Sequence, residues 1–117
     1  MRTPRRQRSA ASLVLVAGLS ACTIVGHQRV EGWPELKVVE HYVSHPEMRD
    51  RCVKYTAFGM SPEACAEFDF INRTCHIWYS ADFPPTQWII DHERLHCEGY
   101  DHIGSTSMRA MVARFKQ

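Results

Sequence analysis

An eleven-residue stretch that begins at His92 reads His-Glu-x-x-His-x-x-Gly-x-x-His, and it constrains this chain more than any other feature. At about 3.6 residues per helical turn, His92 and His96 lie one turn apart on one helix face, where both imidazoles can reach one ion. Glu93 is rotated by about 100° from His92 and flanks that ion. Gly99 can adopt a positive φ, which lets the chain turn back after the helix. This turn brings His102 towards the same ion.

Three histidines at this spacing predict a zinc site that leaves one tetrahedral position to water, as catalytic zinc sites do. Zinc lowers the pKa of such a water to about 7, and Glu93 is placed to take its proton. The hydroxide then attacks a carbonyl that the same ion polarises. The stretch therefore predicts hydrolysis with Zn²⁺ as cofactor, Glu93 as general base, and three ligands: His92, His96 and His102.

The same string resembles the active-site motif of the metzincin metallopeptidases. The resemblance implies that the three histidines bind zinc, that Glu93 is the general base and that Gly99 makes the turn. Metzincins also have a Met-containing turn beneath the metal, and Met108 is the candidate for it. Only fifteen residues follow His102, far fewer than the family has there. The resemblance therefore covers the motif and at most the strand before it.

The N-terminal residues 1–21 have the form of a secretory signal peptide. Basic residues come first, an apolar run from Ala10 to Leu19 follows, and small residues precede Cys22. The apolar run is too short to span a bilayer as a helix. Leu-Ser-Ala-Cys, ending at Cys22, resembles a bacterial lipobox, which implies cleavage before Cys22 and its lipidation; plain secretion is the alternative. The residue after this cysteine is Thr23 and not Asp. By analogy with Gram-negative lipoproteins, this favours a location in the outer membrane that faces the periplasm.

Charge excludes one class of partner. Removing the four leader arginines leaves ten basic and thirteen acidic residues in the remaining 96. A mildly acidic chain with no basic run offers no electrostatic footprint for nucleic acid. We expect instead a peptide or protein substrate in the cell envelope, and contact with the membrane through the lipid on Cys22.

Four cysteines remain when Cys22 is set aside. In an oxidising compartment an even number indicates two disulfides, which small exported domains often need, and four cysteines can pair in three ways. We favour Cys52–Cys65, which closes a local loop, and Cys75–Cys97, which joins the strand before the motif to the metal-binding helix.

The sequence predicts an α+β fold: a minimal zincin-like domain with a small antiparallel sheet, an active-site helix and a C-terminal helix. Residues 22–34, which include His27, read as the lipidated cysteine and a tether, and residues 35–117 as the metallopeptidase domain. The expected elements before the motif are a strand over 36–43, a short helix or loop over 46–52, and two strand-like stretches over 68–79 with a turn at Asn72-Arg73. Ser61 and Pro62 form a helix-start pattern, which predicts a helical turn or two over 64–68. The motif helix follows Thr86, and a last helix covers 106–115.

The strand-like segment Cys75–Ser80 has a mechanistic interpretation. In zincin-like peptidases an edge strand pairs with an extended substrate, which makes His76, Ile77 and Trp78 candidate substrate contacts; an interior strand is the alternative. The leading hypothesis is a zinc metalloendopeptidase of the cell envelope. The alternatives are a non-catalytic zinc-binding lipoprotein that acts as a protein-interaction module, and a zinc amidase that acts on cell-wall material.

Overall fold

The computed structural model describes residues 25–56 and 61–117. The expected signal peptide and the lipidation site Cys22 lie outside these residues. Within the described ranges, no helix is both long and apolar enough to cross a membrane. The elements, in chain order, are β1 (His27–Arg29), β2 (Lys37–Val43), α2 (His45–Cys52), the short 3₁₀ helix η1 (Val53–Tyr55), β3 (Ala64–Asp69), β4 (Thr74–Ser80), α3 (Gln87–Cys97), β5 (Tyr100–His102) and α4 (Ser107–Phe115).

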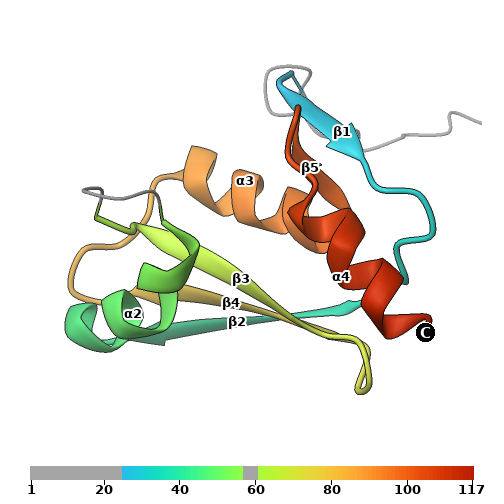
Figure 1. Cartoon of the computed structure of the whole chain (residues 1–117). Helices are drawn as coiled ribbons and strands as arrows, with labels where there is room; N and C mark the ends of the chain where they lie inside the picture. The colour runs from blue at the N-terminus through green and yellow to red at the C-terminus, as the bar shows by residue number, and fades with distance from the viewer. Residues whose placement is uncertain (1–24, 57–60) are drawn as a thin grey trace, which may run out of the picture.

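The fold is α+β, as predicted, with a three-stranded and a two-stranded sheet (Figure 1). The larger sheet has the order β2-β4-β3, and β3 runs antiparallel to β4. The expectation of a purely antiparallel sheet is wrong, because β2 runs parallel to β4. The chain between these two strands carries α2 and β3, so it is long enough to bring β4 back in the direction of β2.

The two faces of β4 have different neighbours. Cys75, Ile77 and Tyr79 point to one face, are fully buried, and form a core that includes Cys97 of α3. Trp78 points to the opposite face, where it packs beside the core of Met48, Cys52 and Cys65 that α2 forms with β3. The alternation of side chains along a strand therefore separates the α3 side of the sheet from the α2 side.

Both favoured disulfides are confirmed. Cys52–Cys65 joins the end of α2 to β3, and Cys75–Cys97 joins β4 to the last residue of α3. The second bond fixes the end of the motif helix on the sheet.

The predicted helical turn over residues 64–68 is wrong, because this segment is strand β3. Ala64, Ala66 and Phe68 face α3, and all six residues of β3 pair with β4. The chain reverses at Arg73, which has a φ of 52°, after the Asn72 amide donates to Asp69 Oδ1 over 3.0 Å. Pairing with β4 therefore overrides the local helix-start signal at Ser61-Pro62.

The N-terminal segment is not a tether over its whole predicted length. β1 pairs antiparallel with β5, and His27 lies opposite His102. Val30 and Trp33 are buried in one core cluster with residues of α4. The expectation of a tether over residues 22–34 is therefore wrong from His27 to Trp33, because two apolar side chains anchor this stretch on the domain.

Candidate metal centre

The motif helix α3 forms as the sequence predicts. Thr86 is its N-cap, and the Thr86 hydroxyl accepts a hydrogen bond from the Ile89 amide at 3.5 Å. Leu95 and Cys97 are buried against the rest of the protein. The turn spacing places His92 and His96 together on another face of the helix, with their Nε2 atoms 3.1 Å apart.

Gly99 makes the turn after α3, as predicted. Its φ is 95°, and its amide donates to the His96 carbonyl at 3.0 Å. A Cβ on this glycine would lie 2.5 Å from Cγ of Trp33, whose indole N–H donates to the Cys97 carbonyl at 3.0 Å. Glycine is therefore required at this position for two reasons: the positive φ of the backbone and the close approach of the indole ring.

Strand β5 follows the turn and carries His102. The buried carboxylate of Asp101 accepts from the His102 amide at 2.8 Å and from the Met108 amide at 3.2 Å. Because Met108 lies in the first turn of α4, one side chain fixes β5 and satisfies a free N–H at the start of that helix.

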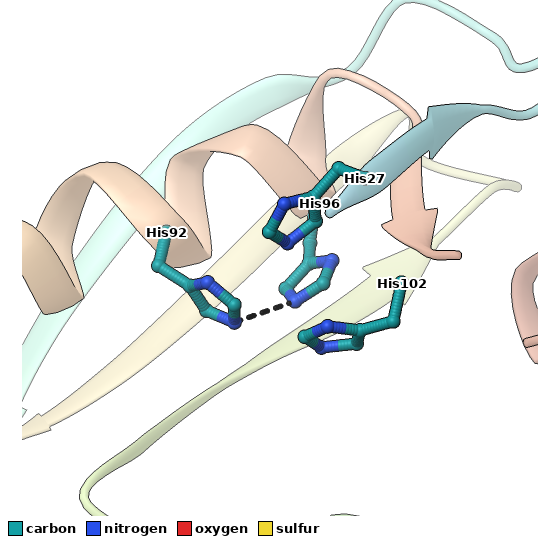
Figure 2. Close-up of side chains that lie close together, drawn as sticks. All are labelled: His27, His92, His96 and His102. Atoms are coloured by element: carbon teal, nitrogen blue, oxygen red, sulfur yellow. Dashed lines mark hydrogen bonds between the residues drawn. The ribbon is translucent and has the colours of Figure 1, made fainter. Parts of the chain in front are cut away.

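Four histidines meet at this place (Figure 2). Each of His27, His92, His96 and His102 offers a ring nitrogen that lies within 4.8 Å of the others. Two come from α3, one from β5 and one from β1, and their side chains point towards a common centre. The structure therefore brings the three predicted ligands together and adds His27 to them.

The donor set fits a bound metal ion. Four nitrogens around a tetrahedral zinc lie about 3.4 Å from one another, and the Nε2 atoms of His92 and His96 are 3.1 Å apart. The Tyr100 carbonyl, 2.7 Å from His96 Nδ1, can only accept, so this nitrogen carries the proton and Nε2 presents its lone pair. Among the described residues, neither buried ring nitrogen of His27 has a hydrogen-bond partner. A bound cation would take the lone pair of one of these nitrogens, while the other carries the proton of the neutral ring.

Burial keeps the helix histidines neutral. Desolvation, followed by the neighbouring histidines, lowers the pKa of His92 to about 4. Desolvation is also the main cause that lowers the pKa of His96. Both rings are therefore uncharged at neutral pH, the state in which imidazole binds a metal.

Glu93 lies beside this cluster and is almost fully buried, with 8% of its surface exposed. Burial raises the pKa of its carboxyl to about 7. It lines a cavity of about 410 Å³ together with His92, His96 and His102. A buried carboxyl with a raised pKa therefore shares a cavity with the predicted ligands.

Met108 does not form a turn of its own. It lies in the first turn of α4, where it packs against Val30, Trp33 and Val112. The expectation of a Met-turn at this residue is therefore wrong, because Met108 is helical. Met108 nevertheless lines the same cavity as the histidines, because Asp101 draws the start of α4 towards β5.

The predicted substrate strand is also misplaced. His76, Ile77 and Trp78 lie on β4, the central strand, which has a partner on each side. Ile77 is fully buried, and His76 bonds with His41 at 2.8 Å on the sheet face opposite α3. None of the three lines the cavity. In the three-stranded sheet it is β3 that lines the cavity, through Ala64, Ala66 and Phe68 among others.

His27 is the functional candidate that sequence reasoning placed in the tether. Its segment is short and polar and shows no alternation of apolar residues, so the strand had no periodic signal. Two sequence signals could have pointed to His27: it follows a glycine, and the apolar residues Val30 and Trp33 come shortly after it. They mark a turn and an anchor, but they do not show which strand β1 joins.

Comparison with protein-family models, with curated proteins and with solved structures gives no match for this chain.

Proposed function

We propose that this protein is a zinc-dependent metallopeptidase of the cell envelope. One observation carries the proposal: the buried carboxylate of Glu93 lines the same cavity as the three histidines of the motif. Zinc held by His92, His96 and His102 would polarise a substrate carbonyl and acidify water. A buried acid next to three imidazoles is what metal-assisted hydrolysis requires of the protein.

Glu93 provides the proton transfer. As a base it accepts a proton from the attacking water, and as an acid it delivers that proton to the leaving nitrogen when the C–N bond breaks. A carboxyl whose pKa is raised to about 7 is near the optimum for both steps at neutral pH. Asp101 supports the site differently, because its carboxylate is already occupied by two main-chain amides.

We assign substrate binding to β3 in place of β4. β3 stands at the end of the strand order, so in the described residues one of its edges has no strand partner. Ala64, Ala66 and Phe68 of this strand line the cavity that holds the histidines. An extended peptide added to this edge would make main-chain hydrogen bonds beside Glu93. The small alanine side chains leave room for the side chains of such a peptide.

The cellular location is part of the proposal. Two disulfides are typical of proteins that fold in an oxidising compartment. With the signal-peptide pattern and the cysteine at position 22, they support an exported lipoprotein, anchored in the outer membrane and facing the periplasm.

The test is Glu93→Gln, which keeps the shape of the side chain and removes its basicity. We expect the variant to bind one zinc per chain and to lose hydrolysis of a diverse peptide library by at least about a hundredfold, the contribution of a general base. Metal content measured by elemental analysis separates loss of chemistry from loss of metal.

Glu98→Gln is the matched control, because Glu98 is exposed at the C-cap of the same helix and does not line the cavity. It should cleave as the wild type does. Equal cleavage by wild type and Glu93→Gln would refute the role of Glu93. Absence of zinc from the wild type would refute the metal site itself.

One observation favours a second function. Sites in which the protein supplies all four ligands are structural in most zinc proteins, and His27 makes a fourth donor available. On that basis the protein would be a non-catalytic zinc-binding lipoprotein that acts as a protein-interaction module. Zinc-loaded His27→Ala that still cleaves no peptide would support this function over the peptidase.

A further inference from the structure

We propose that His27 is a releasable fourth metal ligand, so that the folded chain holds its metal in a closed, latent site that opens when β1 leaves β5. This inference rests on the proposed function, since latency has meaning only for a site that works when open. It gives β1, which lies outside the motif, the role of controlling access to the metal.

The geometry makes His27 equivalent to the other three histidines. Its ring centroid lies 5.0 Å from that of His92, 5.7 Å from His96 and 4.9 Å from His102. The three motif rings lie 4.7 to 5.1 Å from one another. Both nitrogens of His27 are buried without a hydrogen-bond partner in the described residues. A histidine at this position takes the tetrahedral position that a catalytic site leaves to solvent.

The strand that carries His27 is weakly held. β1 has three residues, and β5 is its strand partner in a two-stranded sheet. Gln28 and Arg29 are exposed, and the Gln28 amide group donates to the carbonyls of Ser105 at 3.0 Å and His102 at 3.4 Å. Isolated two-stranded ribbons are marginally stable in water. The strand can therefore open at a far smaller cost than the unfolding of the domain.

The segment after β1 is held firmly and limits the movement. Val30 is buried, and its amide donates to the Gly99 carbonyl at 2.8 Å. Trp33 is fixed by its packing on Gly99 and by its bond to Cys97. Opening therefore pivots near Val30 and leaves the motif turn intact, so the other three ligands stay in place.

The first test replaces the metal of the full chain, purified in detergent, with Co²⁺ and follows its visible spectrum during titration with azide. A closed site should show no change, whereas His27→Ala should show a shift, because azide can enter the vacated position. His27→Ala should also weaken Co²⁺ binding by at least about tenfold. Identical spectra and azide responses in both proteins would overturn the assignment of His27 as a ligand.

Two further variants guard this result. His27→Val keeps strand propensity and should behave like His27→Ala, while His45→Ala removes a histidine that contacts Ser80 and Phe83 and should behave like the wild type. The cobalt measurements need no peptide. They decide the inference even if neither protein cleaves a substrate, an outcome that would refute only the proposed function.

The second test addresses release. Gln28→Ala removes the two side-chain hydrogen bonds of β1 but leaves all four histidines. We expect an unchanged Co²⁺ spectrum and a several-fold faster transfer of the metal to a chelator. Peptide hydrolysis, if present, should rise in His27→Ala by about tenfold or more. Unchanged metal transfer in Gln28→Ala would show that opening of β1 does not control access.

Discussion

The four histidines form one cluster, but two regions with very different support supply them. The motif region holds its three through the Cys75–Cys97 disulfide, the packing of Trp33 on Gly99 and the buried Asp101. The N-terminal strand holds His27 through a three-residue ladder with exposed neighbours. The four histidines therefore differ in how easily each can leave the cluster, because different contacts hold the backbone of each one.

The largest effect is expected at the turn of the motif region. Gly99→Ala places a Cβ against the Trp33 ring at a positive φ. Backbone strain of about 1 kcal/mol and overpacking of about 2 kcal/mol should lower the free energy of unfolding by roughly 3 kcal/mol. Urea unfolding measures this loss.

Gly104→Ala is the control for that variant. Gly104 also has a positive φ, but no atom of the described residues lies within 4 Å of the position of its Cβ. It should lose only about 1 kcal/mol, the strain part alone. Equal losses at both glycines would show that the packing of Trp33 does not stabilise the turn.

The two disulfides should separate stability from metal binding. Replacing Cys75 and Cys97 by alanine opens a crosslink between residues 22 apart, and the change should cost about 3 kcal/mol. The Cys52–Cys65 pair spans 13 residues and should cost nearly as much. Calorimetric titration with zinc should show weaker binding only in the first variant, because only Cys97 belongs to the motif helix. Equal weakening in both would mean that general destabilisation controls affinity.

A smaller effect is expected at Asp101. Asp101→Ala leaves the amides of His102 and Met108 without their acceptor, which should cost about 2 kcal/mol. The melting temperature should fall, and zinc should bind more weakly because β5 is less fixed. Asp50→Ala, at an exposed position, serves as the control. An unchanged melting temperature would remove Asp101 from the support of the motif region.

The smallest effect on global stability is expected in β1. Gln28→Ala removes two exposed hydrogen bonds and should change the free energy of unfolding by less than about 1 kcal/mol. Hydrogen exchange should nevertheless quicken at the amides of β1 and remain unchanged in α3. A loss as large as that of Asp101→Ala would mean that β1 belongs to the cooperative core and is not a separate unit.

The sequence predicted those parts whose signals are local. The spacing from His92 to His102 specifies a helix, a glycine turn and a return, and Thr86 and Gly99 take the places expected of them. Both favoured disulfides are also present, and they join cysteines that are 13 and 22 residues apart in the chain. In these cases the residues that determine the structure are close together in the chain.

Other parts depend on which strands pair, and local patterns do not specify pairing. Ala64–Asp69 carries a helix-start signal before it, and β4 nevertheless pairs with it as a strand. His27 lies 65 residues before His92, and it reaches the histidine cluster only because β1 joins β5. The same lack of information made β4 appear to be an edge strand, although β2 and β3 flank it.

The position of β1 also limits the distance between the histidine cluster and a membrane anchor at Cys22. His27 is five residues after Cys22, and an extended chain of that length spans at most about 18 Å. With a lipid on Cys22, His27 would remain within that distance of the bilayer surface, and any pull on the anchor would act first on the hydrogen bond from the Ile103 amide to the Gly26 carbonyl and then on β1. The contacts of β1 would then bear the load between the protein and its membrane, before the buried anchor at Val30 and Trp33.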